Sequence, residues 1–174
     1  MKQLNFPRVI QTYEYDCGAK ALQAVLLYYG LEVREEALIK CAKTNKKEGT
    51  LINPLVAVFK KYGLKTDSRS LTVKELKKYL DKKIPVMLLL QAWSFEKIDY
   101  TDSYRDGHWA IAIGYDKDKI FFEDPYSFAY VYLSYEELKE RWHAQEKDQK
   151  IINHGIAVYG KKPAYNPQRM IHMD

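Results

Sequence analysis

The sequence predicts an α+β fold, in which a helical N-terminal half packs on an antiparallel β-sheet formed by the C-terminal half. Apolar residues recur at helical spacing up to about residue 82, whereas short apolar runs separated by turn-like breaks follow from residue 85. Helices followed by strands, without alternation, favour an antiparallel sheet over a doubly wound parallel one. The 174 residues, 47% of them hydrophobic, suit one domain, expected over residues 1–162 with a tail over residues 163–174.

The first helix is expected over about residues 17–29. Its apolar face repeats at i, i+3, i+4 and i+7, at Leu22, Val25, Leu26 and Tyr29. Asp16 is a candidate N-cap, and Gly30 provides the C-terminal stop. Cys17 therefore lies in the first turn of this helix.

Four more helices are expected, over about residues 35–43, 53–62, 72–82 and 134–143. The last two open with Ser/Thr-x-x-Glu capping boxes, and the helix at residue 53 opens with Asn-Pro, an N-cap followed by a first-position proline. The polar segments 44–50 and 93–107 are predicted to be loops.

Five strands are expected, over residues 85–91, 108–115, 120–123, 129–133 and 156–160. The polar residues 116–119 form a turn between the second and third of them, which predicts a β-hairpin.

Cys17 is the candidate nucleophile. Unpaired backbone N–H groups and the positive end of the helix dipole stabilise a thiolate at a helix N-terminus, and a thiolate is the nucleophile of cysteine hydrolases. The alternative interpretation is a small buried apolar residue. Cys41 lies on an apolar helix face and is predicted to be structural.

His108 and Asp124 are the candidate base and its orienting acid. They stand at the paired ends of the predicted hairpin, which brings them within hydrogen-bonding reach. The alternative is a strand-end histidine beside a turn-forming Asp-Pro. His154 precedes a strand in a similar way, but no acidic residue is placed to orient it.

Gln11, six residues before the cysteine, is a candidate oxyanion-hole donor. Its side-chain amide and the backbone N–H of Cys17 would supply the two donors that acyl transfer needs. A surface glutamine is the alternative interpretation, so this role depends on that of Cys17.

Other function classes find little support. No cofactor and no metal site are expected, because the histidines and cysteines show no ligand spacing and the glycines form no phosphate loop. The net charge of +5 is mild and the lysines come in small groups, so solvated helix faces are favoured over nucleic-acid binding. No apolar run is long enough to span a membrane and no secretory signal is recognised, which predicts a cytoplasmic protein.

Two segments of the sequence resemble a known family. The stretch Gln11-Thr-Tyr-Glu-Tyr-Asp-Cys-Gly-Ala, running on to Tyr-Tyr-Gly at residues 28–30, is similar to the first motif of the papain-like double-glycine leader peptidases. Gly107-His-Trp-Ala-Ile-Ala-Ile-Gly-Tyr, together with Asp124-Pro125, resembles their second motif. These bacteriocin-processing cysteine peptidase domains resemble the chain over about residues 11–133.

The resemblance implies a papain-like fold and a cysteine peptidase with a Cys-His-Asp triad at Cys17, His108 and Asp124, with Gln11 in the oxyanion hole. In the family, a leader peptide is cleaved after a Gly-Gly pair, commonly by the cytoplasmic domain of an exporting transporter. This chain carries no transmembrane segment and no ATPase, so a stand-alone member with a peptide or protein substrate and a separate transporter is expected. Its irregular segment 93–107 and its C-terminal extension depart from the family pattern.

Three other interpretations stay open at this point. The same four residues would serve transfer to an amine or deamidation, and the substrate of a stand-alone relative is a leader, another peptide or a non-peptide amide. A non-catalytic peptide-binding module on the same scaffold is the second alternative, and a basic nucleic-acid binder is the third. The sequence does not indicate the oligomeric state.

Overall fold

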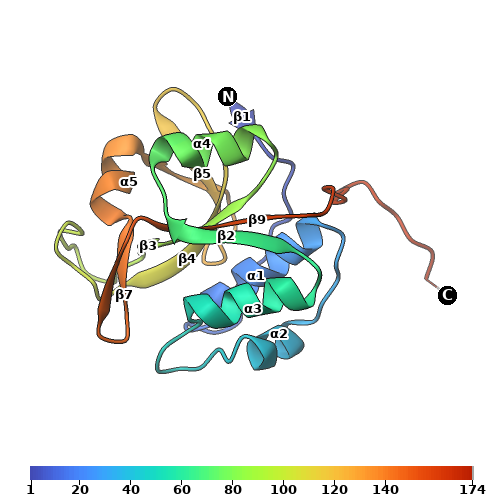
Figure 1. The fold of residues 1–174 in the computed structure, drawn as a ribbon, viewed down its shortest axis with the longest axis horizontal. Coiled ribbons are helices and arrows are strands. Elements are labelled where there is room, and N and C mark those ends of the chain that lie inside the picture. The colour runs from blue at the N-terminus through green and yellow to red at the C-terminus, as the bar shows by residue number, and fades with distance from the viewer. Residues whose placement is uncertain (174) are drawn as a thin grey trace.

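The computed structural model describes residues 1–173 and shows helices on both sides of a central sheet (Figure 1). Three helices gather on one side of strands β2 and β9 in this view, and two lie on the other side. The first three are α1 (Cys17–Tyr28), α2 (Glu35–Cys41) and α3 (Ile52–Lys61). The other two are α4 (Val73–Asp81) and α5 (Tyr135–Arg141).

The strands form an antiparallel sheet in the order β2-β9-β3-β4-β5-β6, with β1 also paired to β4. β7 and β8 form a separate two-stranded hairpin. The nine strands of the described residues are β1 (Lys2–Gln3), β2 (Lys65–Ser70), β3 (Val86–Gln91), β4 (Gly107–Tyr115), β5 (Lys119–Glu123), β6 (Val131–Ser134), β7 (His143–Glu146), β8 (Gln149–Ile152) and β9 (His154–Tyr159). The predicted α+β class with an antiparallel sheet is confirmed.

The core lies where α1 packs against β4. The predicted apolar face of α1 is buried, and β3 is buried along its whole length because the sheet is covered on both faces there. The helix ends where expected, since Gly30 adopts a φ of +76°, a conformation that favours glycine.

Four strands were not predicted: β1, β2, β7 and β8. β2 has the sequence Lys-Thr-Asp-Ser-Arg-Ser and forms at the edge of the sheet through backbone pairing with β9, so it lacks an apolar alternation to reveal it. The hairpin β7–β8 replaces the end of the predicted helix 134–143, which stops at Arg141. Trp142 leaves the helical conformation there and its buried indole donates to the carbonyl of His154 at 2.9 Å.

Two predicted helix starts differ in the structure. α3 begins at Ile52, not Asn53, and the backbone N–H of Ile52 donates to Oε1 of Glu146 at 2.6 Å. This partner comes from β7, 94 residues away, so no local pattern shows it. Asp16 occupies the N-cap position of α1, but its carboxylate does not cap the helix.

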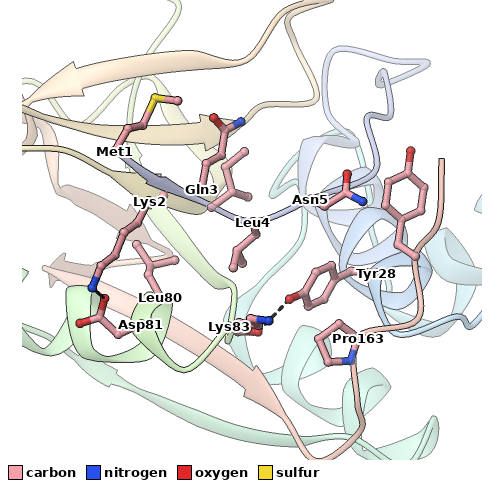
Figure 2. A pocket seen from close by; sticks show the side chains of 13 residues that line it. Met1, Lys2, Gln3, Leu4, Asn5, Tyr28, Leu80, Asp81, Lys83 and Pro163 are labelled. Atoms are coloured by element: carbon pink, nitrogen blue, oxygen red, sulfur yellow. Dashed lines mark hydrogen bonds and ion pairs between the residues drawn. The ribbon is translucent and has the colours of Figure 1, made fainter. Parts of the chain in front are cut away.

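Residues 1–5 line a cavity of about 580 Å³ beside α1, together with Pro163 and Tyr165 from the segment after β9 (Figure 2). The hydroxyl of Tyr28 donates to the carbonyl of Lys83, and the carbonyl of Tyr28 accepts from the backbone N–H groups of Ala164 and Tyr165. Residues 163–173 contain no helix or strand, and Asp174, the last residue of the expected tail, lies outside the described residues. None of the helices formed by residues 1–173 has the length and apolar character needed to cross a bilayer.

Replacing Gly114 with alanine is expected to destabilise the protein, because β1 pairs with β4 at this position and its backbone comes very close. A Cβ on Gly114 would lie 2.3 Å from the backbone oxygen of Lys2 and 2.8 Å from Cα of Gln3. Overpacking of this kind costs about 1–3 kcal/mol. Urea unfolding of Gly114→Ala should show this loss, while Gly107→Ala, whose Cβ would meet nothing nearer than 3.9 Å, serves as the control. Equal free energies of unfolding for the two variants would contradict the close approach of β1.

Candidate active site

Cys17 is half-buried at the first position of α1, and the residue after it lies against β4. A Cβ on Gly18 would stand 2.6 Å from Cβ of Thr50 and 2.8 Å from the ring of Trp109. Only a glycine allows this contact without displacing its neighbours. Because Trp109 directly follows His108, the contact brings the start of the helix to the start of the strand.

The turn before Cys17 is held by the buried carboxylate of Asp16. Its Oδ2 accepts from the backbone N–H of Thr12 at 3.1 Å, and its Oδ1 accepts from that of Tyr13 at 3.2 Å. This turn carries Gln11 and Cys17 at its two ends. Asp16 therefore fixes the distance between the proposed oxyanion donor and the proposed nucleophile.

His108 and Asp124 lie together as the hairpin geometry requires. His108 is the second residue of β4 and Asp124 follows the last residue of β5, so antiparallel pairing brings both to the same end of the hairpin. Nε2 of His108 lies 2.7 Å from Oδ1 of Asp124, and both side chains are buried. Since Nε2 faces the carboxylate, Nδ1 is the ring nitrogen left for Cys17.

The charges around His108 favour a protonated ring. Burial lowers the pKa of the imidazole, but the charges of Asp124 and of the Cys17 sulfur, and hydrogen bonds to both, outweigh it and raise this pKa to about 10. Burial raises the pKa of Asp124, but the His108 charge and the hydrogen bonds that the carboxylate accepts bring it below its ordinary value. The buried Asp124 carboxylate and the protonated His108 ring therefore stabilise each other.

Gln11 lies beside these residues because its backbone is bonded to the segment after Asp124. Its N–H donates to the carbonyl of Pro125 at 2.8 Å. Its side-chain Nε2 donates one hydrogen to the carbonyl of Tyr13 at 2.9 Å, and an amide nitrogen has a second hydrogen to give. The structure thus brings Gln11, Cys17, His108 and Asp124 together from three separate segments.

Two hollows meet at Cys17. One is a narrow cleft of about 140 Å³ that Gln11, Cys17 and His108 line together. The other is a polar basin of about 790 Å³, bordered by charged residues of the α2–α3 loop and of the β7–β8 turn. Gly107 lines both hollows, so an extended chain crossing from one to the other would pass the sulfur of Cys17.

Comparison with known proteins identifies the family. Residues 5–145 match the sequence model of the Peptidase C39 family. The chain belongs to this family. No curated protein matches the chain.

Solved structures share the fold of this C39 chain. A C39-like peptidase from Bacillus anthracis superposes with a TM-score of 0.73 at 19% identity, covering 94% of this chain and 100% of that one. A double glycine motif protease from an AMS/PCAT transporter, solved with its leader peptide, gives 0.67 at 17% identity and coverages of 94% and 95%. The peptidase domain of Streptococcus ComA gives 0.66 at 23% identity and coverages of 88% and 97%. The papain-like fold implied by the sequence resemblance is therefore confirmed.

Two residues near the site of the C39 chain were missed by sequence reasoning. Trp93 donates from its indole Nε1 to Oδ2 of Asp124 at 2.9 Å, and no periodic pattern surrounds it in the irregular segment. The other is the buried Glu123, whose Oε1 accepts from the backbone N–H of Val9 at 2.8 Å. Burial raises the pKa of Glu123 to about 7. Glu123 directly precedes Asp124 in the sequence, but nothing in the local sequence indicates that its side chain is buried.

His154 and His143 have surroundings that differ from those of His108. Nε2 of His154, on β9, lies 3.0 Å from Oγ of Ser68 on the paired strand β2. Nε2 of His143 donates to the carbonyl of Tyr100 at 2.8 Å. Neither residue lines the cleft or the basin.

Asp16 shares its buried position with Glu35 of α2. Burial raises the pKa of Asp16 to about 6, and a hydrogen bond to Glu35 acts in the same direction. Glu35 also forms an ion pair with Lys20 at 2.9 Å. In the pair, Asp16 is the carboxyl that holds the proton.

Replacing Asp16 with asparagine should stabilise the protein increasingly as pH rises. Between about pH 4 and pH 6 the folded wild type keeps a proton that the unfolded chain has lost, so its stability falls as pH rises through this window. Asparagine has no proton to lose, and its amide oxygen still accepts from Thr12 or Tyr13. The variant should gain on the order of 1 kcal/mol above pH 6 and little at pH 4.

Thermal unfolding of Asp16→Asn across pH 4–8 measures this difference. Asp102→Asn, at an exposed position, corrects for the general loss of one negative charge. The difference in stability between Asp16→Asn and Asp102→Asn should grow with pH. A difference that is the same at every pH would contradict a raised pKa at Asp16.

Proposed function

We propose that this C39 chain is a cysteine peptidase that hydrolyses a peptide bond through a thioester on Cys17. The observation that carries the proposal is that Cys17 lines the same narrow cleft as a buried imidazole, which a carboxylate orients. Nε2 of His108 lies 2.7 Å from Oδ1 of Asp124, and the charges of Asp124 and of Cys17 outweigh burial and raise the pKa of the ring. A cysteine, a base and an orienting group in this order are the parts that nucleophilic catalysis by a thiolate needs.

In the acylation step, the Cys17 thiolate attacks the carbonyl carbon of the scissile bond and the carbonyl oxygen becomes an oxyanion. The carbon–nitrogen bond then breaks, the proton on Nδ1 of His108 passes to the leaving amine, and a thioester remains. Asp124 holds the ring in place by its bond to Nε2 and stabilises the charge before transfer.

In the deacylation step, the neutral His108 takes a proton from water while the water oxygen attacks the thioester. The carbon–sulfur bond breaks, the acyl part leaves as a carboxylic acid, and the imidazolium–thiolate pair is restored. The balance is one water consumed for one peptide bond cleaved.

The oxyanion is bound by two donors in this proposal. The backbone N–H of Cys17 has no intrahelical partner because it belongs to the first turn of α1. The side-chain amide of Gln11 reaches the same cleft. One such donor contributes about 3–4 kcal/mol to lowering the barrier in a comparable enzyme.

The proposed substrate is a peptide whose leader ends in Gly-Gly. Support comes from the family and from the fold shared with a double glycine motif protease solved in complex with a leader peptide. The narrow cleft and the polar basin give an extended chain a path past Cys17. The proposal places the reaction in the cytoplasm, before a separate transporter exports the cleaved peptide.

Iodoacetamide should label Cys17 much faster than Cys41 below pH 7. The imidazolium beside Cys17 favours the reactive thiolate, and we expect a rate at least about tenfold higher, measured by peptide mapping. His108→Ala should remove most of the difference, while His154→Ala should leave it intact. Equal, slow labelling of both cysteines in the wild type would overturn the peptidase proposal and favour a non-catalytic binding module.

The substrate class is tested with precursor peptides encoded beside the gene, offered with and without their Gly-Gly pair. Mass spectrometry should detect a new N-terminus directly after Gly-Gly, and Cys17→Ala should release none. Release of ammonia, or a product joined to an added amine, would show deamidation or acyl transfer at the same site.

Gln11→Ala should lower kcat by about 10²–10³-fold with a smaller change in KM, because the oxyanion forms only after attack. Gln23→Ala is the matched control, because the side-chain amide of Gln23 also donates to a backbone carbonyl, that of Val33, and Gln23 does not line the cleft. A Gln11→Ala variant with wild-type kcat would show that this amide does not bind the oxyanion.

A further inference from the structure

The structure assigns Trp93 as a positioning residue for the Asp124 carboxylate, an inference that rests on the proposed function. Three groups donate hydrogen bonds to this buried carboxylate. Oδ1 accepts from Nε2 of His108 at 2.7 Å and from the backbone N–H of Tyr126 at 2.9 Å. Oδ2 accepts from the Trp93 indole at 2.9 Å, and no other donor to this oxygen is found among residues 1–173.

Without the indole, Oδ2 would be a buried carboxylate oxygen with no partner. An unsatisfied charged acceptor of this kind is costly, and the carboxylate would rotate to recover a donor. Rotation would also move Oδ1, which holds the imidazole of His108. The orientation of the base therefore depends on a side chain that does not contact the ring.

The backbone at Trp93 is held in an unfavourable conformation. Its φ is +61°, in the left-handed region that bulky side chains rarely adopt. Such conformations persist where the surroundings over-determine them, often at functional sites. Here the indole also stacks on Tyr126, with ring centroids 4.7 Å apart and planes at 29°. Two aromatic residues thus enclose Asp124, one from the segment after β3 and one from the segment after β5.

Hydrogen bonds join the two ends of the irregular segment 93–107, and they fix the position of the backbone at Trp93. The N–H of Ala92 donates to the carbonyl of Asp106 at 3.1 Å, and the N–H of Asp106 donates to the side chain of Gln91 at 2.9 Å. Trp93 follows this closure directly and lines the narrow cleft on one side and a hollow of about 220 Å³ behind Asp124 on the other. His108 lines the first of these hollows together with Trp93, and Asp124 lines the second.

The test compares Trp93→Phe, which keeps an aromatic ring but has no N–H, with Trp142→Phe. Trp142→Phe loses the same kind of bond, from the indole to the carbonyl of His154, and Trp142 lines neither the cleft nor the basin at Cys17. The first readout is the iodoacetamide labelling rate of Cys17 against pH. In Trp93→Phe, the fall of the labelling rate at low pH should begin at a higher pH, because the Asp124 carboxylate loses a stabilising donor. In Trp142→Phe, the labelling profile should stay unchanged.

The second readout is cleavage of a precursor peptide with a Gly-Gly leader. Trp93→Phe should lower kcat by about 10- to 100-fold and leave KM within about threefold. If this variant does not fold, the Trp93 indole is replaced by benzothiophene, which has the same shape and no N–H. A labelling profile and kcat equal to those of the wild type would overturn the assignment. Failure of the wild type itself to label selectively at Cys17 would instead overturn the proposed function.

Discussion

The close contact between the start of α1 and β4 is the constraint on which the site depends. Gly18 has no side chain, and any Cβ there would come within 3 Å of Thr50 and Trp109. Cys17 and His108 are the residues directly before the two partners of this contact. A tightly packed core transmits small displacements, so a shift of the helix by the width of a methyl group would separate sulfur and imidazole.

A second set of bonds joins the N-terminal segment to the hairpin that carries Asp124. Val9 donates to Glu123 and Gln11 donates to the carbonyl of Pro125, both at 2.8 Å. The proposed oxyanion donor is thus tied to the neighbour of the orienting acid across more than a hundred residues. The fold itself therefore holds Gln11 close to the segment that carries Asp124.

The sequence predicted what short-range patterns encode. The apolar face of α1 and the turn between β4 and β5 placed Cys17 at a helix start and brought His108 opposite Asp124. The four candidate residues do lie together, while their catalytic roles stay predictions. Glycine at position 18 was part of the recognised motif, but its physical reason, the contact with Trp109, is visible only in three dimensions.

What the sequence did not predict depends on partners distant in the chain. β2 is polar and exists because β9 pairs with it, and α3 starts one residue early because Glu146 binds its first N–H. Trp93 lies in a segment without periodicity, so its bond to Asp124 had no local signal. In each case a residue distant in the chain decides the local structure, and the secondary-structure propensity of the local sequence does not reflect such tertiary effects.

The most direct test of the account is the protonation state of the His108 ring, measured by ¹⁵N NMR of histidine-labelled protein against pH. The account predicts a ring that stays doubly protonated well above the ordinary imidazole pKa of about 6.5, and that titrates at lower pH in Cys17→Ala. A ring that is neutral at pH 7 in the wild type and unaffected by Cys17→Ala would contradict it.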